Sequence, residues 1–147
     1  MTCRILIAAV LTCGLLPGAA GAAEFRAAAD PAVVLYDAPS LKARKLYIVN
    51  KGYPLELVVQ VEGWIKVRDA AGALSWVEAK SLENVRRVLL RTAVTVRQKP
   101  ADDAPAAFEA QRDVLLEVVE GANGGWIHVK HRDGVAGYVR ATEVWGG

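Results

Sequence analysis

The sequence predicts an all-β protein made of two small domains in tandem, preceded by a cleavable signal peptide. Three observations support this prediction. The chain has 147 residues, which is enough for one ordinary domain or two small ones. Residues 25–147 hold two copies of a unit of about 60 residues, and both copies consist of short segments rich in aliphatic and aromatic residues. The first 22 residues have the layout of a secretion signal.

The N-terminal segment shows the three parts of a secretory signal. Arg4 is its only charged residue, an apolar stretch follows at 5–16, and small residues at 19–23 suit cleavage. The apolar stretch is shorter than the roughly twenty residues that a membrane-spanning helix needs. We therefore expect a signal peptide at 1–22, a periplasmic or secreted protein, and no transmembrane span in the mature chain.

Both cysteines of the chain, Cys3 and Cys13, lie inside this signal. The mature chain would then have no thiol, which excludes a disulfide framework, a zinc–cysteine site and a cysteine nucleophile. A lipoprotein acylated at Cys13 is a poorer match, because Thr12 stands where such signals usually need Gly, Ala or Ser.

The composition limits the class of partner. Of all residues, 53% are apolar and 23% are charged, and 18 Lys and Arg against 16 Asp and Glu give a net charge of +2. This balance is unlike the polybasic surface of a nucleic-acid-binding protein, so we expect no nucleic-acid partner. Much of the apolar excess lies in the signal, which leaves the mature chain near the ordinary apolar fraction of globular domains, about half.

The repeat is clearest at an offset of 62 residues, where Trp-Ile-Lys-Val-Arg at 64–68 corresponds to Trp-Ile-His-Val-Lys at 126–130. Trp76-Val77 corresponds to Tyr138-Val139 at the same offset. Upstream the offset becomes 61, which one residue inserted near 122–124 explains. Two copies are too few for a solenoid, so we interpret them as two small domains.

Each copy is predicted to contain four short strands, which are runs of β-branched, leucine and aromatic residues separated by turns with Gly or Asp. In chain order they are 32–36, 55–61, 64–68 and 75–78, then 93–97, 114–120, 126–130 and 136–139. No part of the mature chain keeps a helical period over about ten residues, so helices are minor. Residues 42–51 are expected to form a loop, and alanine-rich Ala104–Ala110 a loop with at most a turn or two of helix.

Alternation with a period of two assigns the faces of the strands. Ile65 and Val67 point to one side of their strand, whereas Trp64, Lys66 and Arg68 point to the other, and the second copy alternates likewise. The aliphatic side should face the core, which leaves one Trp per copy on the outer face beside basic side chains. Either this Trp lies flat over the sheet edge under Lys and Arg stems, or the face is a binding groove of aromatic and cationic groups.

Each copy orders its motifs in the same way: a strand, Gly-Trp with a basic and aliphatic run, a turn with Gly, an aromatic–Val pair and a short turn. This order resembles the bacterial SH3 domain family. The matching segments are 51–58, 62–69, Gly72, Trp76-Val77 and Leu82 in the first copy, and 94–97, Pro100, 125–130 and 137–139 in the second. The resemblance covers essentially all of 25–147. It implies two tandem SH3-like small β-barrels in an exported protein of Gram-negative bacteria, with a non-catalytic role such as attachment to peptidoglycan or its stem peptides.

The pattern departs from eukaryotic SH3 domains at the polyproline-binding groove. Those domains place a Pro and a Tyr after the aromatic–aliphatic pair. Here the corresponding places hold other residues: Glu78, Ala79 and Ser81 in the first copy, and Arg140, Ala141 and Glu143 in the second. Polyproline recognition is therefore not expected.

A second departure concerns how the barrels close. The first copy has an apolar segment after Leu82 that could serve as a last strand, whereas the second copy stops soon after its matching turn. We therefore predict a first barrel at 24–91, closed by a strand at about 85–90, and a second barrel at 92–147. The second barrel is expected to be open at one edge or completed by its neighbour.

The predicted ligand-binding residues are the outward aromatic and basic side chains of both copies, with the aromatic rings as platforms for cell-wall peptide or glycan and the cations as carboxylate partners. They are Trp64, Lys66, Arg68, Trp76, Trp126, His128, Lys130 and Tyr138. Two further basic clusters are interpreted either as solvated surface or as anion-binding faces. The first comprises Lys42, Arg44, Lys45 and Lys51, and the second comprises Arg86, Arg87, Arg91, Arg97 and Lys99.

Catalytic motifs are not recognisable. His128 and His131 have no carboxylate or thiol at triad or metal-ligand spacing, and no glycine-rich phosphate loop precedes a helix. We predict a binding module with no catalytic residue, no metal and no cofactor, whose partner is peptidoglycan or a stem peptide. The alternative is a periplasmic adaptor that docks on an envelope protein by an SH3-like groove or by a strand edge.

Overall fold

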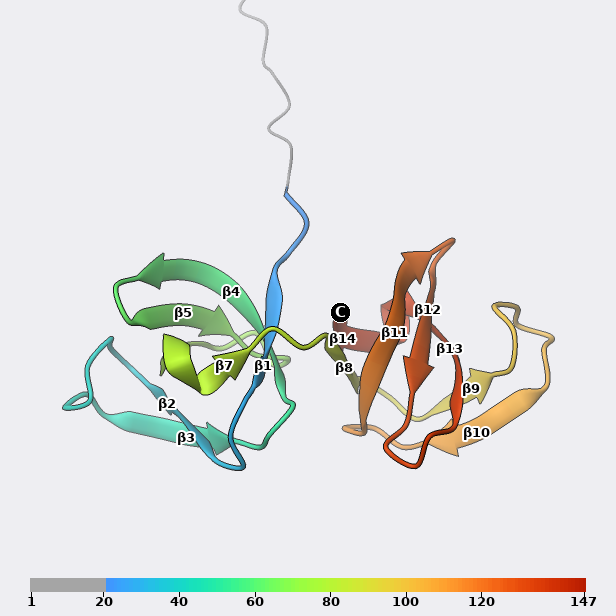
Figure 1. Ribbon diagram of the computed structural model, residues 1–147, viewed down its shortest axis with the longest axis horizontal. Coiled ribbons are helices and arrows are strands. Elements are labelled where there is room, and N and C mark those ends of the chain that lie inside the picture. The colour runs from blue at the N-terminus through green and yellow to red at the C-terminus, as the bar shows by residue number, and fades with distance from the viewer. Residues whose placement is uncertain (1–20) are drawn as a thin grey trace, which may run out of the picture.

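The structure is a computed structural model that describes residues 21–147. The signal peptide expected at 1–22, with Cys3 and Cys13, lies almost wholly outside the described residues and stays a prediction. In the described part of the chain, no helix is long and apolar enough to cross a membrane. The strands form two separate bodies, one for each repeat, which lie side by side in Figure 1.

The first body is a seven-stranded sheet with the order β3-β2-β6-β5-β4-β1-β7. Its strands are β1 (Phe25–Ala28), β2 (Val33–Tyr36), β3 (Lys45–Val49), β4 (Pro54–Val61), β5 (Trp64–Arg68), β6 (Leu74–Glu78) and β7 (Leu82–Glu83). One turn of 3-10 helix, Ala79–Ser81, joins β6 to β7. The four strands predicted for this repeat are confirmed as β2, β4, β5 and β6.

The second body repeats this sheet strand for strand, with the order β10-β9-β13-β12-β11-β8-β14. Its strands are β8 (Arg87–Leu90), β9 (Val94–Arg97), β10 (Ala106–Ala110), β11 (Leu115–Asn123), β12 (Trp126–Lys130), β13 (Ala136–Arg140) and β14 (Val144–Gly146). A 3-10 turn at Ala141–Glu143 precedes β14. The all-β prediction, with one sheet for each repeat, is confirmed.

Each sheet curls around its own aliphatic core. In the first domain the fully buried side chains include Leu35, Leu55, Ile65, Val67 and Val77. Their counterparts in the second domain include Val96, Leu116, Val129 and Val139. Full burial of one such side chain contributes about 1.5–3 kcal/mol, so the alternating pattern that the sequence shows is also the main source of stability.

The hairpin between β4 and β5 turns on only two residues, Glu62 and Gly63. Gly63 has a φ of +75°, a region that glycine enters without steric cost. This tight turn brings Trp64 directly opposite Val61. It thereby sets the register of the strand that carries the predicted site residues.

The closing strand is assigned to the other domain from the one predicted. Residues 87–90 form β8, which pairs with β11 and β14 of the second sheet. The first sheet is completed instead by β1, which pairs with β4 and β7. The prediction that a strand at 85–90 closes the first barrel is therefore wrong. The physical reason is that β1 already occupies the place beside β4. The second sheet was expected to be open at one edge or completed by its neighbour: it takes up residues 87–90, and β14, which among the described strands pairs with β8 alone, is the last strand of its order.

Two segments expected to be loops are edge strands. β3 lies within the predicted loop at 42–51, and β10 lies within the alanine-rich Ala104–Ala110. Each pairs along one side with its hairpin partner, β2 or β9. β3 exposes its first four residues and β10 buries only its last, so neither strand has one buried and one exposed face, and the period-two signal is lost.

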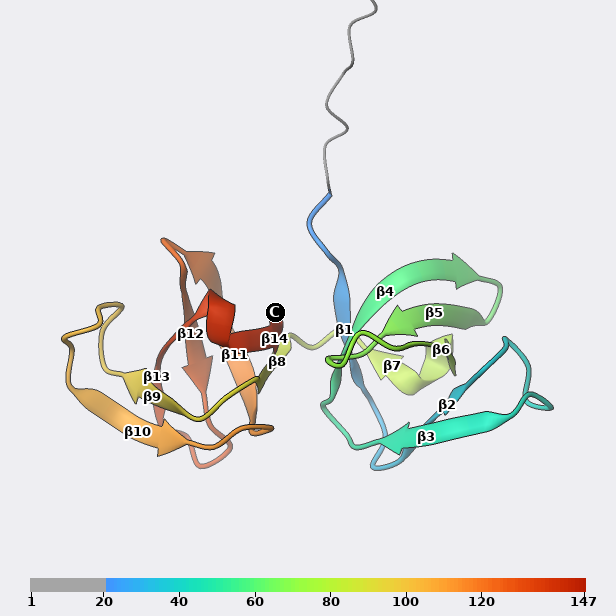
Figure 2. The ribbon, with the colours of Figure 1, turned by 180° about the vertical axis from the view of Figure 1, so that it is seen from behind.

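The two domains touch through Trp145, the central residue of β14. Its indole Nε1 donates a hydrogen bond to the carbonyl oxygen of Pro54 at 3.1 Å. The ring also lies edge-on to Phe25, with centroids 5.1 Å apart, and the guanidinium of Arg91 covers it at 5.2 Å. Figures 1 and 2 both show β14 beside β8, between the bulk of the second domain and β1 of the first.

Gly146→Ala is expected to open this contact. Gly146 has a φ of +103°, and a Cβ there would lie 2.5 Å from the carbonyl oxygen of Arg87 and 2.8 Å from Cβ of Pro54. We expect a loss of about 1–3 kcal/mol in the unfolding free energy of the second domain, together with faster exchange of the Trp145 indole proton. Gly134→Ala is the matched control, because Gly134 has a φ of +96° but no atom within 4 Å of the added Cβ. Equal losses in the two variants would contradict the close contact.

Candidate functional site

The outer faces of β5 and β12 hold most of the predicted site residues. Ile65 and Val67 are fully buried, whereas Trp64, Lys66 and Arg68 are partly exposed on the opposite side of β5. The predicted division of β5 into two faces is thus confirmed. In β12 the aliphatic residues are likewise buried, and His128 and Lys130 are partly exposed.

In the first domain, three aromatic rings and one lysine gather on this face, and we call them the Trp64 face: Tyr36, Trp64, Lys66 and Trp76. Lys66 is the cross-strand partner of Trp76, and Trp76 is in turn the partner of Tyr36. The ring of Tyr36 meets Trp64 edge-on at 5.4 Å between centroids. Lys66 Nζ lies 5.9 Å from the centroid of Trp76, within the range of a cation–π contact.

Lys66 is the cation of this face that stays available to a ligand. Among the described residues it forms no ion pair. Its ammonium lies beside the ring of Trp76, which is uncharged and so does not neutralise it. Arg68 differs, because its Nη1 contacts Glu56 Oε2 at 2.9 Å across the β4–β5 ladder. Lys130 is held by the corresponding carboxylate, with 3.7 Å between its Nζ and Glu117 Oε1. The structure therefore supplies Arg68 and Lys130 with carboxylate partners inside the chain.

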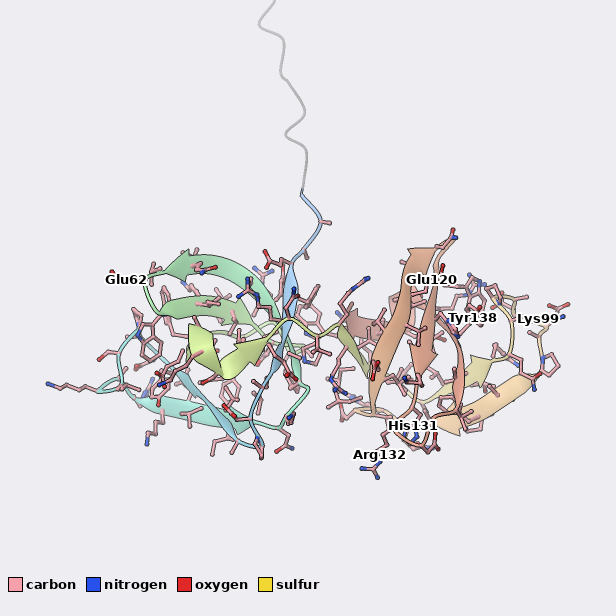
Figure 3. All side chains as sticks on the ribbon, in the orientation of Figure 1. Glu62, Lys99, Glu120, His131, Arg132 and Tyr138 are labelled. Atoms are coloured by element: carbon pink, nitrogen blue, oxygen red, sulfur yellow. The ribbon has the colours of Figure 1, made fainter. Side chains whose placement is uncertain are left out.

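The second domain has a pocket at the equivalent place, with a volume of about 390 Å³. Its lining residues come from β11, β12, β13 and the loop after β9: Pro100, Glu120, Gly121, Asn123, Gly124, Trp126, His128 and Tyr138. The rings of His128 and Tyr138 are stacked, with centroids 4.6 Å apart and 12° between their planes. We call this site the His128 pocket. Figure 3 labels Glu120 and Tyr138 in the upper half of this domain, and His131 and Arg132 at its lower end.

The prediction that both repeats expose a Trp is wrong for Trp126. Only 9% of Trp126 is exposed, because the guanidinium of Arg140 lies 4.3 Å from the centroid of its ring. Asp102 holds Arg140 in place through an ion pair and a 3.2 Å hydrogen bond from Nε. In the first domain Glu78 stands at the position of Arg140, and none of the cations at 21–147 covers Trp64 in this way. The interpretation of a Trp lying under a cationic stem thus describes Trp126, whereas Trp64 remains partly open.

Several residues of these faces were not predicted from the sequence. Tyr36 joins the Trp64 face from β2, and Glu120 and Asn123 line the His128 pocket from β11. Glu120 and Asn123 belong to an extended hairpin whose length depends on the residue inserted in the second copy. The sequence did contain one signal that Trp126 is covered. The residue opposite the Trp is Glu78 in the first repeat and Arg140 in the second, and an arginine can lie over an indole ring.

A larger cleft of about 540 Å³ lies between the domains, but its polar groups mostly satisfy one another. It is lined by Asn50, Tyr53, Ala70, Ala71, Leu89, Leu90, Arg91, Arg112, Asp113 and Leu115. The hydroxyl of Tyr53 accepts a hydrogen bond from the Ala70 amide at 3.3 Å. Arg112 and Asp113 lie 3.8 Å apart as an ion pair. None of the predicted site residues lies in this cleft.

The two histidines do not form a common centre. His128 stacks on Tyr138, whereas His131 lies at the turn after β12, where its Nδ1 is 3.0 Å from Asp133 Oδ2. The amide of Val135 donates to Asp133, which together with His131 lowers the pKa of that carboxyl. Within residues 21–147, no group of three or more His, Cys, Asp and Glu side chains has the arrangement of a metal site.

The comparison with protein families gives two matches to one model. The model of the bacterial SH3 domain matches residues 29–84 and again residues 91–146. Each match covers one of the two sheets apart from its first strand in the chain, β1 or β8. A search of curated proteins finds no match.

Solved structures similar to this chain include NlpC2 and NlpC1 from Trichomonas vaginalis and an NlpC/P60 family protein from Bacillus cereus ATCC 10987. NlpC2 shares 17% identity with a TM-score of 0.39, over 84% of this chain and 48% of its own. NlpC1 shares 16% with a TM-score of 0.41, over 87% and 47%. The Bacillus protein shares 13% with a TM-score of 0.38, over 84% and 56%. The present chain thus spans about half the length of these solved chains.

Proposed function

Because this chain belongs to the bacterial SH3 domain family, we propose that it is an exported, non-catalytic module that binds peptidoglycan or its stem peptides. The observation that supports this proposal best is the Trp64 face. It offers two partly exposed indole rings, Trp64 and Trp76, and Lys66, which is the cross-strand partner of Trp76 and forms no ion pair among the described residues. The proposed location, the periplasm or the cell exterior, rests on the layout of residues 1–22.

The chemistry of the Trp64 face suits a cell-wall fragment. Sugar rings and peptide backbones pack against flat aromatic surfaces, which lose little conformational freedom on binding. A stem peptide also carries carboxylates, and Lys66 can pair with one of them without first breaking an internal ion pair. In such a complex, stacking on the aromatic rings would supply affinity, and the ion pair with Lys66 would fix the orientation of the fragment.

The His128 pocket is proposed as a second and different subsite. Its stacked His128 and Tyr138 rings replace the Lys66 and Trp76 pair of the first domain. Glu120 and Asn123 add hydrogen-bonding groups that the first domain lacks at this place. The two domains therefore need not bind the same part of a cell-wall fragment.

Co-sedimentation with purified sacculi tests the proposal. Trp64→Ala is expected to weaken binding at least about tenfold, as truncation of a central aromatic contact commonly does. Lys66→Gln should weaken it less and should flatten the dependence of binding on salt. Arg68→Gln is the matched control, because it removes a charge on the same strand that Glu56 already neutralises.

Two results would contradict the proposal. One is the absence of co-sedimentation at low salt, and the other is unchanged binding after Trp64→Ala. Trp126→Ala is not a useful probe, since removing a Trp that is 9% exposed would cost about 3–5 kcal/mol of stability. His128→Ala and Tyr138→Ala test the second subsite instead.

The alternative function is a periplasmic adaptor that docks on an envelope protein by an SH3-like groove or by a strand edge. Residues 87–90 belong to the second sheet as β8, so the short C-terminal end of the second repeat no longer argues for a missing strand there.

A further inference from the structure

We infer that the outer edge of β3 is a docking edge for an extended acidic segment of another protein, which would add a strand to the first sheet. This edge is distinct from the Trp64 face, because β3 is the terminal strand of the sheet order and contributes none of the four residues of that face. The two are neighbours at one point, where Tyr36 of the face pairs with Lys45 of β3. The inference therefore goes beyond the proposed cell-wall binding and does not depend on it.

The first observation is that β3 is exposed along nearly its whole length. Lys45, Leu46, Tyr47 and Ile48 are all exposed, with 61% of Ile48 and 38% of Leu46 accessible to solvent. β3 pairs with β2 on one side only, and within the described residues no backbone hydrogen bond reaches its other side. Figures 1 and 2 both show β3 at the periphery of the first domain.

The second observation is the contrast with β10, the same edge in the second domain. Glu109 stands in β10 where Ile48 stands in β3, and Ala107 stands where Leu46 stands. Glu109 also accepts a hydrogen bond from the Thr95 hydroxyl at 2.9 Å. Charged side chains along an edge strand are one usual protection against pairing. β10 has such a charge within the strand at Glu109, whereas β3 has a charge only at its first residue, Lys45, and exposes apolar Leu46 and Ile48 after it.

The third observation is the charge around β3, which selects the kind of partner. Lys42, Lys45 and Lys51 are exposed and form no ion pair within the described residues. Arg44 contacts Asp37 at 3.3 Å, so it alone of this cluster has its charge balanced. A second copy of the same edge would bring these lysines together at a cost. A segment with acidic and apolar residues in alternation would complement both the cations and the exposed Leu46 and Ile48.

The mode of binding follows from the free backbone of β3. An added strand gains main-chain hydrogen bonds along the edge, and its alternate side chains meet those of β3 on the two faces of the sheet. On one face its apolar residues would cover Ile48 and Leu46. Acidic residues at its ends would lie near Lys42, Lys45 and Lys51.

The test uses the whole chain and a synthetic heptapeptide of alternating Glu and Val, acetylated and amidated at its ends. We expect saturable binding by calorimetry, slower amide hydrogen exchange at 45–49, and weaker binding as salt rises. Ile48→Glu, which installs the residue type of β10, should weaken binding at least tenfold. Val119→Glu is the matched control, because Val119 is also exposed, at 51%, but lies on β11 of the second domain.

Four outcomes would overturn the inference. The first is equal binding of the heptapeptide by the Ile48→Glu variant, and the second is equal binding of a peptide in which Lys replaces every Glu. The third is a dimer in sedimentation analysis that Ile48→Glu abolishes, because the edge would then pair with a second copy. The fourth is binding to vesicles of anionic lipid that depends on Ile48, without any binding of the peptide.

Discussion

Gly137→Ala is expected to lower the unfolding free energy of the second domain by about 3 kcal/mol, the upper part of the range for overpacked cores. Gly137 is buried in β13 where this strand crosses β9. A Cβ at Gly137 would lie 2.6 Å from the carbonyl oxygen of Arg97, 2.7 Å from Cγ1 of Val96 and 3.1 Å from Cβ of Ala107. Two of these atoms belong to backbone or to a stiff β-branched side chain, so relief requires β9 and β13 to separate.

Urea unfolding, followed by the fluorescence of the Trp residues, measures this loss. Gly121→Ala is the matched control, because its added Cβ would meet only the guanidinium of Arg86, with the nearest nitrogen at 3.0 Å. That guanidinium ends a flexible side chain and can move away. A loss below about 0.5 kcal/mol for Gly137→Ala would mean that the strands do not approach as closely as described.

Asp69→Ala is expected to cost the first domain about 2–3 kcal/mol, since it removes hydrogen bonds to a charged group in a nearly buried position. Asp69 is 7% exposed and follows β5 directly. Its Oδ1 accepts the amides of Ala71 and Ala73 at 2.9 Å each, and its Oδ2 accepts the Tyr47 hydroxyl at 2.6 Å. One carboxylate thus shapes the turn into β6 and ties it to β3.

The second domain supplies the control for this variant. Asp133 also accepts an amide in the matching turn, from Val135 at 3.0 Å, but its side chain is 58% exposed. Asp133→Ala should therefore cost much less stability than Asp69→Ala, because water replaces the lost bond. Equal losses for the two variants would show that burial of Asp69 is not the source of its effect.

Titration of Tyr47 gives Asp69→Ala a second readout. Burial, the hydrogen bond to Asp69 and the charge of Asp69 raise the pKa of Tyr47 from 10.0 to about 12. A phenol with a raised pKa in the folded state contributes stability below its unfolded pKa and loses it as the pH rises. The wild-type unfolding free energy should therefore fall between about pH 10 and 12. Asp69→Ala removes the two causes that come from Asp69, so tyrosinate absorbance should appear at lower pH and this fall should shrink.

The two domains use different side chains where the edge strand, β3 or β10, meets the turn after β5 or β12. At the positions of Tyr47 and Asp69, the second domain has Phe108 and His131, whose rings lie 5.9 Å apart at an angle of 50°. A hydrogen-bonded phenol and carboxylate in one repeat thus correspond to an aromatic contact in the other. Both partners differ together, because a phenylalanine cannot donate a hydrogen bond to a carboxylate and a buried carboxylate without such a donor is costly.

All eight strands predicted from the sequence are present. Strands such as β5, β6, β9 and β13 bury alternate residues and so show a period of two, whereas β4 and β11 lack this alternation and were found by their aliphatic content. The boundary between the repeats was not predictable by these signals. β1 and β8 occupy equivalent places in the two sheets, but Phe-Arg-Ala-Ala at 25–28 has little in common with Arg-Val-Leu-Leu at 87–90. Local composition cannot decide whether an apolar segment between two sheets pairs with the one before it or the one after it.

The predicted site was recovered in part for a related reason. Alternation correctly placed Trp64, Lys66 and Arg68 on one face of β5, since this depends only on the strand period. It could not reveal that Arg140 covers Trp126, because the contact depends on Asp102 in a loop 38 residues earlier. Nor could it show that Glu56 and Glu117 already pair with Arg68 and Lys130, which follows from the register between strands.

The positions of β1 and β8 have a consequence for how such chains can change in length. In each sheet the first strand lies next to the last, β1 beside β7 and β8 beside β14. Each repeat therefore begins and ends at the same edge and brings its own closing strand. A duplication or deletion that spans one whole repeat leaves every sheet complete, and a circular permutation that joins the ends of one repeat needs only a short linker.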